Sequence, residues 1–160
     1  FGGFSGQRVG WGASRSGDPN GRSPVAGLAP GDVDGSVVQF ANMIRLKTGK
    51  SPLDYNRYGC YCGLRGAKQP LDATDWCCHA HDCCYSRLKS SSPGCHPILV
   101  PYKYSVQGGV IVCGAGSSCQ KTACECDKAA AECFKRNLRS YNKSYDNYPN
   151  FRCRGSSPRC

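Results

Sequence analysis

Apolar side chains recur every three or four positions near the start of the cysteine-bearing part of the chain. Val37, Phe40 and Ile44 follow this spacing, Met43 follows it more loosely, and Gly49 supplies a stop. The pattern predicts a short amphipathic helix. Its apolar face is expected to pack into the core, as most such faces do.

A second helix is predicted from Ala73 to about Ser90, where the chain has no glycine or proline. Pro70 and Asp72 supply its start, and Pro93-Gly94 ends it. His79 lies off the inner stripe and is expected to be an exposed polar residue. The predicted inner stripe consists of Trp76, Cys77, Ala80, Cys84 and Leu88.

The remaining predicted elements are a β-hairpin and a third helix. Tyr102–Ser105 and Val110–Cys113 flank a turn at Gly108-Gly109 and predict two short strands. From Thr122 to about Tyr141 the helical period returns. Its expected inner residues are Cys126, Ala129, Cys133 and Leu138, and its expected basic face is formed by Lys128, Lys135, Arg136 and Arg139.

Residues 1–35 differ in composition from the rest of the chain. They hold ten of the twenty glycines, no cysteine and no apolar period, so they cannot bury enough surface to offset chain entropy. We predict a disordered extension over 1–35 and one folded domain over 36–160. Because the chain starts at Phe1 without a signal-peptide pattern, we expect a processed or truncated product.

Fourteen cysteines among 160 residues are typical of a secreted, disulfide-rich protein. The even number allows every thiol to pair, but counting leaves the connectivity open. The longest apolar runs, such as Val110–Val112, are far too short to span a bilayer. We therefore expect an extracellular protein.

The formal net charge of +10 belongs entirely to residues 36–160, which hold 18 basic and 8 acidic side chains. Such a field favours anionic membranes, sulfated glycans or nucleic acid as partners, although it is also compatible with a plain soluble basic protein. The basic residues available for such binding include Lys135, Arg136, Arg139, Arg152, Arg154 and Arg159.

The candidate chemistry lies in the second helix, where residues 77–85 read C-C-H-A-H-D-C-C-Y. His81 and Asp82 are neighbours on a helix, so their side chains diverge by about 100° and must have different roles. An aspartate beside the glycine-bearing loop at residues 58–66 suits Ca²⁺, which takes oxygen ligands. A histidine acting as a base needs an orienting carboxylate, and Asp127 is the best candidate.

A zinc site was the alternative for this cluster, because zinc binds sulfur and imidazole ligands. Cysteines in an extracellular chain are more often oxidised to disulfides, which disfavours this interpretation. The residues concerned are Cys77, Cys78, His79, His81, Cys83 and Cys84.

These motifs resemble the secreted phospholipases A2 of group II type, closest to the IIA/IIE branch. The resemblance runs from about Ser36 to Cys160 and includes Y-G-C-Y-C-G, P-L-D-A-T-D-W-C-C-H-A-H-D-C-C-Y, C-E-C-D-K-A-A-A-E-C-F and Y-P-N-F-R-C-R-G-S-S-P-R-C. It implies a mainly α, disulfide-rich fold with two long antiparallel helices, a short first helix, a calcium loop and a small hairpin.

The resemblance also implies calcium-dependent hydrolysis of the sn-2 ester of glycerophospholipids at membrane interfaces. His81 would deprotonate a water, Asp127 would orient His81, and Tyr85 and Tyr102 would hold Asp127. The Gly63 N–H would help to form an oxyanion hole. Calcium would be bound by the Asp82 carboxylate and by the main-chain carbonyls of Tyr61, Gly63 and Arg65.

The basic charge leads us to expect binding to an anionic phospholipid surface and to heparan-type glycans. We also expect a monomer and no role for nucleic acid.

Further expectations come from the same resemblance. The acyl channel would be lined by Val37, Phe40, Ile44 and Phe134. The expected disulfides are Cys60–Cys153, Cys62–Cys78, Cys77–Cys133, Cys83–Cys160, Cys84–Cys126, Cys95–Cys119 and Cys113–Cys124.

One departure from the family pattern keeps a rival interpretation open. The calcium loop of the family reads C-G-x-G-G, whereas this chain has Arg65 at the fourth position. The rival is a catalytically weak or silent protein of the same fold that acts as a receptor ligand, a glycan- or membrane-binding basic protein, or a matrix protein. Asn142-Lys143-Ser144 is additionally a glycosylation acceptor pattern.

The extension before Ser36 generates the first prediction. In the family that the chain resembles, a free amino terminus just before the first helix helps to order the membrane-contacting surface. Removal of residues 1–35 is therefore expected to raise hydrolysis of aggregated lipid, measured as fatty-acid release from vesicles. Equal rates with and without these residues would contradict the prediction.

Overall fold

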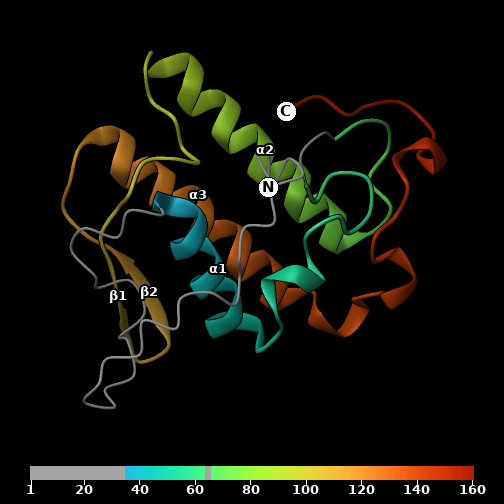
Figure 1. Ribbon diagram of the computed structural model, residues 1–160, viewed down its shortest axis with the longest axis horizontal. Coiled ribbons are helices and arrows are strands. Elements are labelled where there is room, and N and C mark those ends of the chain that lie inside the picture. The colour runs from blue at the N-terminus through green and yellow to red at the C-terminus, as the bar shows by residue number, and fades with distance from the viewer. Residues whose placement is uncertain (1–34, 64–65) are drawn as a thin grey trace.

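The computed structural model describes residues 35–63 and 66–160 (Figure 1). Helices and one two-stranded antiparallel sheet form this part of the chain, which confirms the predicted fold class. Residues 1–34 of the predicted extension lie outside the described residues, so its disorder stays a prediction. The elements are α1 (Gly35–Thr48), α2 (Ala73–Ser91), β1 (Tyr104–Gln107), β2 (Val110–Cys113), α3 (Ser118–Arg136) and the short 3-10 turns η1 (Pro52–Asp54), η2 (Leu138–Ser140), η3 (Lys143–Tyr145) and η4 (Asn150–Arg152).

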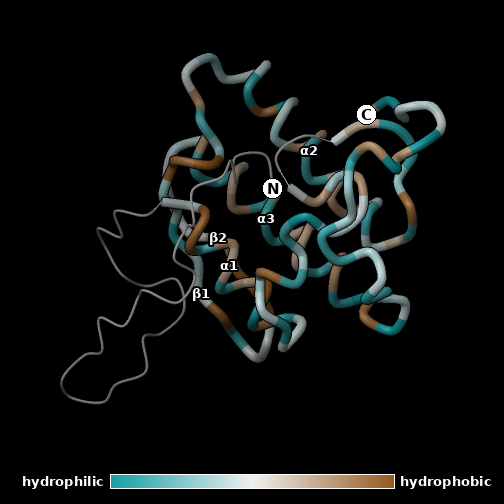
Figure 2. Tube along the Cα trace, turned by 45° about the vertical axis from the view of Figure 1, so that its right-hand side comes forward, coloured by the Kyte–Doolittle hydropathy of each residue, from teal (hydrophilic) through white to brown (hydrophobic). Residues whose placement is uncertain are grey.

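The two long helices, α2 and α3, run antiparallel, and α3 packs against both α2 and α1 (Figure 1). Two disulfides, Cys77–Cys133 and Cys84–Cys126, join the long helices at successive levels, as an antiparallel pair requires. Hydrophobic and hydrophilic stretches alternate along the helices, as expected for elements with one buried face (Figure 2). No helix among the described residues is long and apolar enough to cross a membrane.

All the predicted disulfides form, and no cysteine is left free. Because every cysteine lies in the described part of the chain, this confirms the whole set of bridges that the resemblance implied. The pairs are Cys60–Cys153, Cys62–Cys78, Cys77–Cys133, Cys83–Cys160, Cys84–Cys126, Cys95–Cys119 and Cys113–Cys124.

The start of α2 is confirmed, because the Asp72 side chain accepts a hydrogen bond from the Asp75 backbone N–H at 2.8 Å. The bounds of α3 were predicted too late at both ends. It begins at Ser118 because Ser117 and Gln120 form a capping box. It ends at Arg136, and the chain continues through Asn137 into a 3-10 turn.

The hairpin turn at Gly108-Gly109 is confirmed, since both residues have positive φ and Gln107 pairs with Val110 across it. The first strand was predicted two residues too early. The backbone N–H of Tyr102 donates to Gln39 Oε1 at 3.0 Å, and the Gln39 side-chain amide donates back to the Tyr102 carbonyl. Because the backbone N–H and carbonyl of Tyr102 bond to α1, they do not pair with the second strand, and β1 begins at Tyr104.

The inner stripe of α2 was partly wrong. Trp76 and Ala80 are exposed, and so is Ala129 on α3. His79 was predicted to be exposed but is only 7% accessible, because its Nε2 lies 3.1 Å from the carbonyl oxygen of Pro158. The buried residues of α2 include Thr74, Cys77, Cys78, His81, Tyr85 and Leu88.

Two buried clusters make up the core. One contains Phe40, Ile44, Tyr55 and Phe134, with the rings of Tyr55 and Phe134 stacked at 4.1 Å between centroids. The other joins the hairpin to the helices through Met43, Leu88, Tyr104 and Ile111, among others. The first cluster supports the loop at residues 58–63, so core packing and the candidate site are connected.

Substitution of Phe134 tests the contribution of the first cluster. Phe134 is 1% exposed, so Phe134→Ala is expected to lower the free energy of unfolding by about 3–5 kcal/mol. Phe151→Ala is the matched control, because that ring is 77% exposed and its loss should change stability by less than about 0.5 kcal/mol. Urea unfolding with intact disulfides measures both; equal effects would contradict the core assignment.

Candidate active site

The carboxylate of Asp127 is the centre of the candidate site. It is fully buried on α3. His81 Nε2 lies 2.7 Å from Asp127 Oδ1, and the Tyr102 hydroxyl donates to Oδ2 at 2.7 Å. The Tyr85 hydroxyl also donates to Oδ1. The structure thus brings together the four side chains predicted to form the catalytic arrangement.

Local structure explains why these groups meet. His81 and Tyr85 are four residues apart on α2 and therefore lie on one face. The Cys84–Cys126 disulfide joins the residues immediately before Tyr85 and Asp127. Tyr102 arrives from the segment before β1, where Gln39 holds its backbone.

Burial sets the protonation of the site. It raises the pKa of both tyrosine hydroxyls well above 10, with a further contribution from the Asp127 charge, so both stay protonated and donate. Burial lowers the pKa of His81 below its usual value, although the hydrogen bond to Asp127 acts in the opposite direction. A neutral imidazole that donates Nε2–H to the carboxylate has its lone pair on Nδ1.

Aromatic rings fix the orientation of the imidazole. Phe40 stacks on His81 with centroids 4.6 Å apart, and the Tyr85 ring lies at 4.2 Å. Phe40 was predicted to line an acyl channel together with Ile44 and Phe134, and these three residues share the first buried cluster. Val37, the fourth predicted channel residue, is half-buried one turn before Phe40. Their role as a channel stays a prediction.

The predicted calcium loop lies beside α2. The Cys62–Cys78 disulfide fastens it one helical turn before Asp82. Gly63 has a φ of 143°, a conformation that favours glycine. Burial, and to a smaller extent the charges of Asp75 and Asp82, raise the pKa of the Tyr61 hydroxyl. Arg65, the remaining predicted ligand, lies outside the described residues.

Asp75 is a site residue that the sequence analysis missed. Its buried carboxylate accepts hydrogen bonds from the backbone N–H groups of Cys60, Tyr61 and Leu71, each at 2.8 Å. It therefore fixes the main chain that enters the predicted loop. In the sequence Asp75 looks like an ordinary acidic residue in the first turn of a helix, and its position two residues before the cysteine-rich run is the only signal that could have indicated its role.

The donor groups of the described residues do not support a zinc site. Among residues 35–63 and 66–160 there is no group of three His, Cys, Asp or Glu side chains that could hold a metal ion. Every cysteine is in a disulfide, which removes the soft ligands of the zinc alternative. The Asp82 carboxylate and the main-chain carbonyls predicted as ligands would form an oxygen-only donor set, the kind that calcium prefers, and this ligand set stays a prediction.

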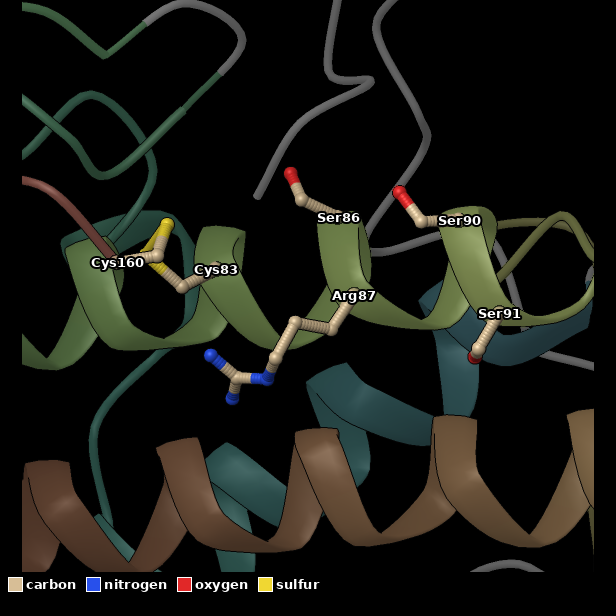
Figure 3. Close-up of a pocket in the computed structure, with 6 residues that line it drawn as sticks. All are labelled: Cys83, Ser86, Arg87, Ser90, Ser91 and Cys160. Atoms are coloured by element: carbon tan, nitrogen blue, oxygen red, sulfur yellow. A yellow bond between two sulfur atoms is a disulfide. The ribbon is translucent and has the colours of Figure 1, made fainter.

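A cavity of about 490 Å³ opens elsewhere on the surface, at α2 and the C-terminal cysteine (Figure 3). None of the predicted site residues lines it. The hydroxyls of Ser86 and Ser90 point away from the Arg87 guanidinium, so its polar groups do not converge (Figure 3). Its lining consists of Cys83, Ser86, Arg87, Ser90, Ser91 and Cys160.

Comparison with known proteins identifies the family. The family model for phospholipase A2 matches residues 37–146. The group IIE secretory phospholipase A2 of Homo sapiens is 55% identical over 128 residues, which cover 80% of this chain and 89% of the relative. The membrane-associated phospholipase A2 of Mus musculus is 56% identical, with 80% and 88% covered. The basic phospholipase A2 ammodytoxin A of Vipera ammodytes ammodytes is 52% identical, with 80% and 91% covered.

The contacts of Asp75 lead to a prediction about the loop. Asp75→Asn leaves one acceptor oxygen for three backbone N–H donors, so the free energy of unfolding should fall by about 1–3 kcal/mol. Amide hydrogen exchange at Cys60 and Tyr61 should accelerate. Glu125→Gln, an exposed change on α3, is the control. Unchanged protection at both amides would show that Asp75 does not hold the loop.

Proposed function

The chain belongs to the phospholipase A2 family, and on this premise we propose that it hydrolyses the sn-2 ester of glycerophospholipids at membrane interfaces in a calcium-dependent reaction. The products are a fatty acid and a lysophospholipid. The observation that carries the proposal is the buried Asp127 carboxylate, which accepts hydrogen bonds from both tyrosines and pairs with His81. A structural role alone would not require a histidine in this arrangement.

His81 serves as the general base. Its neutral imidazole takes a proton from water at Nδ1, and the water oxygen then attacks the ester carbonyl carbon. The bond from that carbon to the sn-2 alkoxide oxygen then breaks, and the imidazolium returns its proton to this oxygen, which leaves as the hydroxyl of the lysophospholipid. Asp127, 2.7 Å from Nε2, stabilises the imidazolium that forms. Tyr85 and Tyr102 hold this carboxylate in place through their hydroxyl hydrogen bonds and stay protonated themselves, because burial raises their pKa values.

The groups proposed to hold calcium are the Asp82 carboxylate and the main-chain carbonyls of Tyr61, Gly63 and Arg65. When bound, calcium polarises the ester carbonyl and offsets the negative charge that develops on its oxygen. The Gly63 N–H is proposed to donate to that oxygen as well. Arg65 adds a positive charge next to a cation, so we expect calcium binding weaker than with glycine at this position.

The exposed cations support an anionic lipid surface as the partner. A positive surface concentrates the protein at anionic headgroups, with about 1 kcal/mol for each basic residue near the membrane. Heparan-type glycans would bind the same charges, and we keep them as a second proposed partner. The exposed basic residues of the last helix and the C-terminal segment include Lys135, Arg136, Arg139, Arg152, Arg154 and Arg159.

Hydrolysis of anionic phospholipid vesicles, titrated with Ca²⁺, tests the proposal. The assay uses residues 36–160, because the extension is expected to slow hydrolysis of aggregated lipid. This wild-type form is expected to release sn-2 fatty acid only with calcium. His81→Gln should lower the rate by about 10²–10⁴-fold, the contribution of a general base. His96→Gln, at an exposed loop histidine, should leave the rate unchanged. Arg65→Gly should lower the calcium concentration required for half-maximal rate.

The outcomes separate the enzyme from its silent rival. Release that survives in His81→Gln would exclude the proposed base. No release by the wild type at millimolar Ca²⁺, with recovery in Arg65→Gly, would identify an intact catalytic arrangement with a defective metal site. No release by either protein would overturn the proposed activity.

A further inference from the structure

The surface segment after α3 contains a motif that phospholipid hydrolysis does not use. Of the asparagines in the sequence, Asn142 alone is followed two positions later by serine or threonine, with the non-proline residue Lys143 between. This tripeptide is the acceptor for N-linked glycosylation. We propose that Asn142 is modified by an N-linked oligosaccharide.

The geometry of the tripeptide suits the modification. Asn142, Lys143 and Ser144 are all exposed. The Asn142 carboxamide oxygen accepts hydrogen bonds from the Ser144 backbone N–H at 3.0 Å and from the Ser144 hydroxyl at 2.6 Å. The hydroxyl that defines the acceptor motif therefore already contacts the carboxamide to be modified.

The nitrogen that would carry the sugar has no role in the fold. Within the described part of the chain, the hydrogen bonds of Asn142 use its side-chain oxygen, its backbone carbonyl, which accepts from the Tyr145 N–H at 2.9 Å, and its backbone N–H, which donates to the Tyr58 hydroxyl at 3.0 Å. Asn137 differs, because its Nδ2 donates to the Cys133 carbonyl at 2.9 Å. A glycan on Asn142 Nδ2 thus costs the protein none of these contacts.

The segment also gives the glycan a fixed base. The ring of Tyr58 contacts those of Tyr141 and Tyr145 on either side of the acceptor, with centroids 4.9 and 6.0 Å away. The Tyr141 hydroxyl donates to the Asp54 carbonyl at 2.6 Å, which ties the segment to η1. The contacts of this aromatic cluster therefore hold the glycosylation acceptor Asn142 at the surface of the protein.

The reaction needs a co-substrate from the secretory pathway, a lipid diphosphate-linked oligosaccharide. The bond between the anomeric carbon and the diphosphate oxygen breaks, and the diphosphate leaves with the electron pair. A bond forms from the anomeric carbon to Asn142 Nδ2, which loses one proton. The proposal rests on passage through an oxidising compartment, which the seven disulfides indicate, and is independent of catalysis.

Mass spectrometry of the peptide that contains Asn142 tests the proposal. The full chain is expressed behind a signal peptide in animal cells and recovered from both cells and medium. An amidase that releases N-glycans in ¹⁸O-labelled water should mark Asn142, and the intact chain should lose mass on this treatment. The marking should disappear in Asn142→Gln and Ser144→Ala. It should persist in Ser144→Thr, which keeps the motif, and in Asn147→Gln, which lies outside it.

The wild-type measurement tests glycosylation of Asn142 even if the variants fail to fold. Unmodified Asn142 in all of the chain from both fractions, while a reference glycoprotein from the same cells is modified, would overturn the proposal. So would a mass shift that Ser144→Ala leaves intact, because the modification would then lie elsewhere. Loss of lipid hydrolysis alone would not bear on it.

Discussion

The packing of the helices around the candidate site depends on satisfying one buried carboxylate, that of Asp127. An ionised carboxylate removed from water is costly unless hydrogen bonds replace its hydration. Asp127 achieves this with His81 and Tyr85 from α2 and with Tyr102 from the segment before β1. The packing of α2 on α3 and the route of the chain into the hairpin must both be correct before this carboxylate is accommodated. The same contacts that stabilise the core therefore build the proposed catalytic arrangement.

Disulfides stabilise this small domain enough for it to hold polar groups in its interior. Cys77–Cys133 and Cys84–Cys126 hold α2 against α3 on either side of His81 in the sequence. Because crosslinks restrict the unfolded chain, they provide stability that a small apolar core cannot supply. The interior between the helices is then free to hold polar groups, and His81, Asp127 and the two tyrosines occupy it.

The sequence predicted the elements better than their faces. Asp72 and the absence of glycine and proline located α2 correctly, since these signals are local. The disulfide pairing came only from the family resemblance, because cysteine counting leaves connectivity open. His79 was misassigned because its cover, the carbonyl of Pro158, belongs to a tail brought back by Cys83–Cys160. Periodicity within a helix cannot detect a contact made by a distant segment.

Asp75 was missed for the same reason, because its role depends on contacts between segments that are distant in the sequence. A carboxylate that accepts three backbone N–H groups is recognisable only when segments distant in sequence meet. The approach is close: at Gly59, where φ is +61°, a Cβ atom would lie 2.5 Å from the Asp75 carboxylate, so a side chain there would displace it.

On one side of Arg65 the loop is held by Asp75 and Cys62–Cys78, and on the other by the bond from the Tyr61 hydroxyl to the Lys68 carbonyl at 2.5 Å. These anchors do not involve a metal ion. The main chain on both sides of Arg65 is therefore fixed by the fold itself. If the proposed calcium site forms here, these anchors do not depend on which residue occupies position 65. The fold and the proposed calcium-dependent activity are therefore separate questions for this chain.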